Sequence, residues 1–489
     1  MHSLEKSLQF WILTGILSLF FLMRLPSLFE PYWYGDEGIY EAIAFALNKG
    51  RILYLQIWDN KPPLLYYTYA IFNGDQFLVR LLSTLYGLLS VLFLYFLSRK
   101  IFPHKNTALI STAFFSLLFG LPILEGNIAN AENFMLPFSI LSGFLVYKNK
   151  SVDSKKLILP GLVLGISFLY KIVGIFDFAA FFLFILFMIF PENISIKKMW
   201  TSIAKYSKPL ITFIASFLIP FAISVLFFLH NNALSDYLSA IFLSTVGYVG
   251  HNNVFIVPQG LLISKLFLLG IVVIVIFLNR QKIQRPLLFI LLWLVFSIFN
   301  SFFSQRPYTH YLLVLLPSIS LLVGAIFYAD KAKKAQFIAL FLLIGVITLM
   351  YFRHWSIKKT LDYYGNFITF VTEKKSVNEY EAFFDKNTVR DRSIISYLTS
   401  KNILENDLFI WGNSAQIYYL TKTLPPTKFT VAYHVENNKE YQDQLQKAID
   451  EKKPRFIINI GDVPSPLKTM YNYNHVLKIG NADIYENLH

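Results

Sequence analysis

The most informative stretch of this chain is a pair of short motifs that follow the first long apolar segment. They read Tyr34-Gly35-Asp36-Glu37-Gly38 and Trp58-Asp59-Asn60-Lys61-Pro62-Pro63-Leu64. An apolar segment long enough to span a bilayer places the loop after it, residues 26–76, at a membrane surface. Ionisable groups in or near a membrane are costly unless they are paired or functional. This loop is therefore where the sequence predicts chemistry.

The composition is that of a membrane protein. Of the 489 residues, 55% are hydrophobic and only 15% are charged, and the mean hydropathy is +0.49. A soluble chain carries about 25% charged residues, whereas here several apolar runs exceed the roughly 18 residues that suggest a spanning helix. The sequence therefore predicts a polytopic α-helical membrane protein.

The excess of positive charge indicates topology and not a nucleic-acid partner. The net charge is +14, but many of the basic residues form short clusters between apolar runs, as cytoplasmic loops do. There is no cysteine, which excludes disulfides and thiolate metal sites. The first apolar run lacks a small-residue cleavage site and is expected to be a retained helix.

We expect about eleven transmembrane helices, with the N-terminus cytoplasmic and the chain multi-pass in an inner or plasma membrane. The alternation of basic loops then makes residues 353–489 external. The predicted division is a transmembrane module, 1–352, and an external soluble α/β domain, 353–489. The expected spans are 8–25, 77–98, 107–122, 129–147, 157–171, 173–190, 209–229, 261–279, 287–303, 311–328 and 336–352.

The C-terminal part alternates candidate strands and helices, which favours a small α/β domain. Strands are expected at 407–412, 428–431 and 455–460, with a last edge strand at 482–485. A capped helix is expected to start at 414–420, and an amphipathic helix at 439–451.

Polar residues gather at the predicted external ends of the helices, while the bilayer midplane is nearly free of charge. A secondary transporter places its site near the midplane, at broken helices; an enzyme for a lipid-linked substrate places it at the interface. The polar residues in question are Asp36, Glu37, Arg80, Glu132, Lys171, Asp177, Arg306, Tyr308, His310 and Tyr311.

These residue types suit transfer from a lipid phosphate. A leaving phosphate needs facing cations, which Lys61, Lys171 and Arg306 can supply, with His310 as a further donor. An attacking hydroxyl needs a base, for which Asp36 or Glu37 is suitable. The amphipathic stretches 38–47 and 63–72 can lie as interfacial helices in the headgroup layer.

Several motifs resemble the GT-C membrane glycosyltransferases, in particular bacterial relatives of protein O-mannosyltransferases and the aminoarabinose (lipid A) transferase. The resemblance covers most of the chain. Its most specific part is the Asp-Glu and Lys-Pro-Pro combination. The matching stretches are Gly35 to Tyr40, Gly50, Asn60 to Leu64, Arg80, Ala131 to Phe134, Gly165 to Lys171, His310 to Pro317 and Phe409 to Tyr418.

The resemblance implies an inverting transferase whose donor is a polyprenyl-phosphate-linked hexose or pentose. It implies that Asp36 is the catalytic base and that Lys61 binds the donor phosphate. We also count Glu37 as catalytic and Arg80, Glu132, Lys171, Arg306, Tyr308 and His310 as substrate-binding. A divalent metal ion held by Asp36 and Glu132 is a further candidate cofactor.

Other functions remain open at this point. The main alternative is a lipid or solute transporter or flippase without transferase activity. A polymerase or ligase for diphosphate-linked oligosaccharides is expected to have a longer external loop, and a purely structural anchor leaves the interfacial charges unexplained. The sequence does not decide whether the acceptor is a glycolipid, a polysaccharide or a protein.

Overall fold

The computed structural model describes residues 2–192, 195–244, 260–303, 308–328, 341, 344–345, 357–436, 438–461 and 473–487. The chain forms two compact units. The first contains residues 1–25, 82–226 and 245–361, and the second contains 26–81, 227–244 and 362–489. The predicted division at 352/353 stays a prediction.

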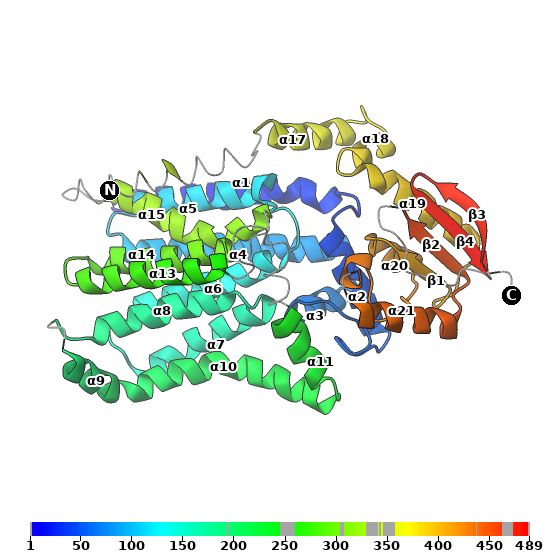
Figure 1. Ribbon diagram of the computed structural model, residues 1–489. Helices are drawn as coiled ribbons and strands as arrows, with labels where there is room; N and C mark the ends of the chain where they lie inside the picture. The colour runs from blue at the N-terminus through cyan, green and yellow to red at the C-terminus, as the bar shows by residue number, and fades with distance from the viewer. Residues whose placement is uncertain are drawn as a thin grey trace. The chain divides into compact units, whose positions relative to one another are not determined.

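The first unit is helical (Figure 1). Within it α6 packs on α7, α5 on α15, and α8 on α14. Its helices are α1 (His2–Arg24), most of α4 (Gln76–Ile101), α5 (Lys105–Gly120), η2 (Pro122–Leu124), α6 (Ala131–Lys148), α7 (Ser154–Tyr170), α8 (Gly174–Ile189), α9 (Ile196–Lys205), most of α10 (Ser207–His230), α13 (Gly260–Asn279), α14 (Arg285–Ser301), η4 (Thr309–Leu315) and α15 (Leu316–Tyr328).

The prediction of a polytopic membrane protein is confirmed. Each expected span from 8–25 to 311–328 coincides with a helical segment. The span expected at 336–352 lies almost wholly outside the described residues, so the total number of spans stays a prediction. Within the described part, five segments are long and apolar enough to cross a bilayer, namely Ser7–Phe29, Gln76–Ile101, Ser207–His230, Leu262–Asn279 and Thr309–Phe327.

Two glycines allow α7 and α10 to approach so closely that their backbones are in contact. A Cβ on Gly161 would lie 2.8 Å from the carbonyl oxygen of Phe213, and one on Gly165 would lie 2.4 Å from that of Phe217. The spacing of four residues places both glycines on one face of α7. Small residues at this spacing are a common device for close packing of transmembrane helices.

The second unit combines the loop after α1 with the C-terminal part of the chain. The loop supplies α2 (Gly35–Asn48) and α3 (Pro63–Ile71), which confirms both expected interfacial helices as helices. Further helices of this unit are α11 (Leu234–Leu238), the π-helical η3 (Ser239–Leu243), most of α17 (Ile357–Val371), α18 (Val377–Ala382), α19 (Lys386–Ser400), α20 (Gln416–Thr421), η5 (Ala432–His434) and α21 (Lys439–Lys452).

A four-stranded sheet forms the core of the C-terminal part (Figure 1). Its order is β1 (Leu408–Trp411), β2 (Phe456–Ile460), β4 (Ala482–Asn487) and β3 (Tyr473–Ile479). β1 and β2 are parallel, while β4 is antiparallel to both β2 and β3. All four residues of β1 are buried, as are four of the five residues of β2. The predicted small sheet domain is thus confirmed.

Three details of the predicted domain were wrong. Residues 428–431 form no strand, and the carbonyl of Lys428 accepts a single backbone hydrogen bond from the Trp58 amide of the loop. β4 is internal, since the unpredicted β3 covers its outer side. The start of α20 has no side-chain cap, and the Ser414 hydroxyl instead accepts a hydrogen bond from Arg390.

Candidate functional site

Asp36 and Lys61, the two leading residues of the sequence analysis, meet in the second unit. Lys61 Nζ lies 3.3 Å from Asp36 Oδ2, and the two side chains remain 21% and 30% exposed. Asp36 lies in the first turn of α2, where the helix dipole favours a carboxylate. The pair is therefore formed and still accessible to a substrate.

Tyrosines hold both partners of this pair. The Tyr40 hydroxyl, one turn along α2, donates to Asp36 Oδ2 at 3.1 Å. Burial raises the pKa of Tyr40, so its hydroxyl keeps the proton that it donates. The Lys61 ammonium also lies 4.9 Å from the centre of the Tyr40 ring, a cation–π distance.

The main chain of Lys61 is held by hydrogen bonds at both its amide and its carbonyl. The Tyr54 hydroxyl donates to the Lys61 carbonyl at 2.7 Å, and the Lys61 amide donates to the Tyr66 hydroxyl at 3.1 Å. Pro62 and Pro63 then begin α3 with fixed backbone angles. The main chain that carries the Lys61 ammonium is consequently rigid.

Asp59 is a member of this cluster that the sequence analysis did not single out. Its buried carboxylate lies 3.8 Å from Lys61 Nζ, accepts a 2.7 Å hydrogen bond from Tyr66 and lies 3.4 Å from His434 Nε2. Burial alone raises the pKa of Asp59, but Lys61, His434 and Tyr66 outweigh it and hold that pKa below its usual range. Asp59 lies within the Trp58 to Leu64 motif quoted above, whereas no motif in the sequence pointed to His434 as a site residue.

Glu37 and Arg80 are joined in a buried cluster. Arg80 donates from Nε to Glu37 Oε1 and from Nη1 to the Ser27 carbonyl, and its Nη1 also lies 3.0 Å from Glu30 Oε2. Tyr363 donates to the other Glu30 oxygen at 2.6 Å. Two carboxylates thus share one guanidinium directly beside the helix that carries Asp36.

Glu132, Lys171 and His310 come together in the first unit. The Lys171 ammonium pairs with Glu132 Oε1 and lies 4.6 Å from the Tyr311 ring centre. His310 Nε2 lies 3.8 Å from the same Glu132 oxygen, and its Nδ1 lies 2.8 Å from Glu125 Oε2. These residues start α6, end α7 and lie on η4, as the predicted external ends of those helices require.

Of the remaining predicted residues, Tyr308 and Asp177 lie within the part of the chain that the structure describes. Tyr308 is 44% exposed and its ring stacks on His310, with centres 5.5 Å apart. Arg306 lies outside the described residues. Asp177 is buried and accepts a 2.8 Å hydrogen bond from the Trp293 indole.

The residues present do not fit the divalent metal ion considered for Asp36 and Glu132. Within the described part of the chain, no group of three His, Asp or Glu side chains is arranged to hold a metal. Each carboxylate instead pairs with an ammonium, Asp36 with Lys61 and Glu132 with Lys171. The metal prediction is therefore not supported, and no step below uses a metal.

Comparison with known proteins agrees with the predicted resemblance. Residues 60–214 match the family model described as dolichyl-phosphate-mannose-protein mannosyltransferase. A search of the curated proteins finds no match.

Among solved structures, the chain is similar to ArnT from Cupriavidus metallidurans, crystallised with undecaprenyl phosphate. The TM-score is 0.59 at 13% identity, over 97% of both chains. The archaeal oligosaccharyltransferase AglB from Archaeoglobus fulgidus gives a TM-score of 0.48 at 12% identity, over 92% of this chain and 69% of that one. The Pmt1–Pmt2 protein O-mannosyltransferase complex of S. cerevisiae gives 0.37 at 21% identity, over 47% and 35%.

These findings confirm the resemblance to GT-C membrane glycosyltransferases of the protein O-mannosyltransferase and ArnT type. The likeness to ArnT over nearly the whole of both chains shows that the fold is the one predicted, a helical membrane module with a small sheet domain.

Proposed function

We propose that this chain is an integral-membrane glycosyltransferase. It moves a hexose or pentose from a polyprenyl-phosphate carrier to an acceptor hydroxyl on the external face of the membrane, with inversion at the anomeric carbon. The observation that carries the proposal is the accessible Asp36–Lys61 pair on a fold shared with ArnT, whose structure contains undecaprenyl phosphate.

The two side chains have complementary roles in such a transfer. The Asp36 carboxylate accepts the proton of the acceptor hydroxyl while the hydroxyl oxygen bonds to the anomeric carbon. The bond from that carbon to the phosphate oxygen breaks, and the polyprenyl phosphate leaves with the electron pair. Lys61 stabilises the negative charge that develops on the phosphate.

We assign Glu37 and Arg80 to positioning. Both are buried and satisfy each other's charge, so together they hold the first turn of α2 and with it Asp36. Lys171, His310, Tyr308 and Arg306 remain proposed substrate ligands, and Glu132 is proposed to orient Lys171. The inner or plasma membrane, with an external C-terminal domain, is the proposed location.

The test is consumption of a radiolabelled polyprenyl-phosphate sugar by membranes that contain equal amounts of each variant. Asp36→Asn and Lys61→Ala should each lower the rate by about a hundredfold or more, the usual effect of losing a positioned base or charge donor. Asp443→Asn and Lys49→Ala remove the same side-chain types from exposed positions and should retain the wild-type rate.

Two results would contradict the proposal. If wild type consumes none of several polyprenyl-phosphate sugars, the transporter alternative gains, because a transporter requires no donor cleavage. If the donor is consumed but both variants match wild type, the reaction stands and the assigned residues are wrong.

A further inference from the structure

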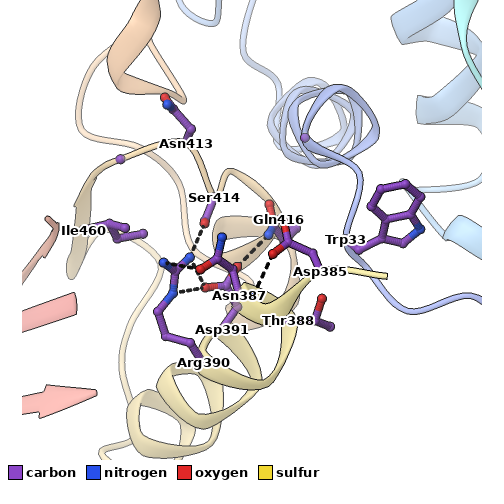
Figure 2. Close-up of a pocket in the computed structure, with 12 residues that line it drawn as sticks. Trp33, Asp385, Asn387, Thr388, Arg390, Asp391, Asn413, Ser414, Gln416 and Ile460 are labelled. Carbon is purple, nitrogen blue, oxygen red and sulfur yellow. Dashed lines mark hydrogen bonds and ion pairs between the residues drawn. The ribbon is translucent and has the colours of Figure 1, made fainter. Parts of the chain in front are cut away.

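A polar cavity of about 200 Å³ lies within the second unit, and Lys61 is not among its lining residues (Figure 2). Its wall is formed by the segment before α2, the start of α19 and the turn between β1 and α20. Figure 2 shows the Trp33 indole on one side and polar side chains on the other, among them Asp385, Asn387, Ser414 and Gln416. Asp385, Asn387 and Gln416 were not singled out from the sequence.

The cavity wall is continuous with the helix that carries Asp36. Gly35 is a lining residue and directly precedes Asp36 in α2. Gln416, from the opposite wall, packs so closely on α2 that a Cβ on Gly38 would lie 2.8 Å from its Oε1. The cavity therefore adjoins the start of the helix that carries the proposed base, although Asp36 itself is not a lining residue.

The cavity does not suit an anion. Its one lining guanidinium, Arg390, is committed to Asp391 at 2.7 Å, Asn481 at 2.7 Å, Ser414 at 3.0 Å and Asn387 at 3.2 Å. Asp385 adds a second carboxylate, which caps α19 through the Asn387 amide. Two carboxylates against one guanidinium leave the wall negative, which disfavours phosphate and carboxylate ligands.

Two lining side chains have buried polar atoms without a hydrogen-bond partner in the described structure. These are the hydroxyl of Thr388, which is 7% exposed, and Oε1 of Gln416, which is 6% exposed. Buried polar atoms are nearly always satisfied in folded proteins, by protein, water or ligand. The hydroxyl of Thr388 can give and accept a hydrogen bond, as binding of another hydroxyl requires.

We propose that this cavity binds an uncharged saccharide unit of the acceptor, with the sugar's apolar face on Trp33 and its hydroxyls on Asp385, Thr388 and Asn413. The inference rests on the proposed glycosyltransferase function and names the acceptor class for that same site. A donor phosphate requires a cation facing it, and the cavity offers none that is uncommitted. The acceptor, in contrast, needs hydroxyl-binding groups next to the base.

The first experiment measures saccharide binding to the purified full-length protein by saturation-transfer NMR. The probes are methyl α-mannoside and methyl β-glucoside, with glucuronate and inorganic phosphate as anionic comparisons. Asn413→Trp fills the cavity from its exposed edge, and Thr388→Val removes one hydroxyl without breaking an internal hydrogen bond. Asn474→Trp on β3 and Thr399→Val on α19 are the matched exposed controls.

The expected result is binding of a neutral glycoside by wild type and by both controls. Asn413→Trp should abolish it, and Thr388→Val should weaken it by about threefold to tenfold, the effect of one neutral hydrogen bond. The inference is overturned if no neutral glycoside binds, if an anion binds more strongly, or if a correctly folded Asn413→Trp binds like wild type. Thermal unfolding of each variant shows whether it is folded.

A second measurement separates this inference from the proposed function. With radiolabelled polyprenyl-phosphate sugar, Asn413→Trp should bind the donor like wild type but transfer it to the acceptor at least tenfold more slowly, whereas Lys61→Ala should lose donor binding. Unchanged transfer by Asn413→Trp overturns the cavity assignment and leaves the transferase proposal intact. If wild type neither binds nor consumes the donor, the transferase proposal fails, and the acceptor role of the cavity fails with it.

Discussion

Arg80 and Glu37, 43 residues apart in the chain, form a two-pronged ion pair in which neither side chain is exposed to more than 2%. Arg80 Nε lies 3.0 Å from Glu37 Oε1, and Nη2 lies 2.5 Å from Oε2. Such a pair fixes geometry strongly, because either charge is costly to bury without the other. It ties the start of α4 to the first turn of α2.

Replacing Arg80 should therefore destabilise the protein. Arg80→Leu leaves Glu37 and Glu30 buried without their shared cation, and we expect a loss of about 3–5 kcal/mol in the free energy of unfolding. Thermal unfolding of the purified protein in detergent is the measurement. Arg392→Leu removes a half-exposed arginine that pairs with Glu381 and should cost no more than about 1 kcal/mol. Equal losses in the two variants would contradict the structural role of Arg80.

Glu41 should make the protein less stable as the pH rises. This glutamate of α2 is 1% exposed and neither carboxylate oxygen has a hydrogen-bond partner in the described structure. Burial, with help from nearby Glu37, raises its pKa well above the usual value, so the folded protein holds a proton that the unfolded chain releases. Stability should then fall by up to about 1.4 kcal/mol per pH unit above the usual carboxylate pKa.

Glu41→Gln tests this directly, because an amide resembles the protonated acid and does not titrate. The variant should unfold at a higher temperature than wild type at pH 8, and the difference should shrink toward pH 5. A variant that is less stable than wild type at pH 8 would show that the ionised carboxylate is needed.

Asp59 should have the opposite pH dependence. Its pKa in the folded protein lies below the usual range, so its stabilising contribution is present above the usual carboxylate pKa and is lost as the solution becomes more acidic. Asp59→Asn should lower stability at pH 7 by about 1–3 kcal/mol. The gap to wild type should narrow progressively below about pH 5.

The same substitution should also affect the reaction, because Asp59 orients the ammonium of Lys61. We expect the KM for the lipid-linked donor to rise more than kcat falls. If Asp59→Asn has the KM of wild type and the same dependence of stability on pH, Asp59 does not orient Lys61. Asp443→Asn, on the exposed face of α21, is the control for loss of a carboxylate.

Lys171 and Glu132 allow a structural role to be separated from substrate binding. Lys171→Met leaves the buried Glu132 without its ammonium and should cost about 3 kcal/mol. Adding Glu132→Gln removes the stranded charge and should recover most of that loss. If Lys171 binds the donor phosphate, the double variant regains stability but not activity. Recovery of both properties would make the pair purely structural.

The sequence predicted the helical elements well because membrane spans have a strong local signal. The Lys-Pro-Pro turn, the two helices of the loop and the apolar runs from 8–25 to 311–328 each depend on neighbouring residues only, and the structure has helices where these runs and loop helices were expected. Asp36 and Lys61 were expected together from their motifs, and the structure brings them to 3.3 Å.

What the sequence did not reveal are contacts between distant segments. His434 meets Asp59 although 375 residues separate them, and nothing in the local pattern around either residue indicates the partner. Arg80 was expected to bind substrate because it stands at the predicted external end of a helix and within the stretches that resemble GT-C glycosyltransferases. Its burial depends on Glu30, Glu37 and Tyr363, which only the tertiary fold assembles. The cavity beside Gly35 was missed for the same reason.

The close approach of α7 and α10 at Gly161 and Gly165 has a consequence for how a long isoprenoid tail enters the protein. At these two glycines the backbone of α7 lies directly against the backbone of α10 and the short side chains of Ser216 and Pro220, so no long side chain can change rotamer there to let a lipid pass. We expect the two helices to move as one rigid body throughout a turnover. Any lateral doorway for the carrier must then open between other helices of the bundle.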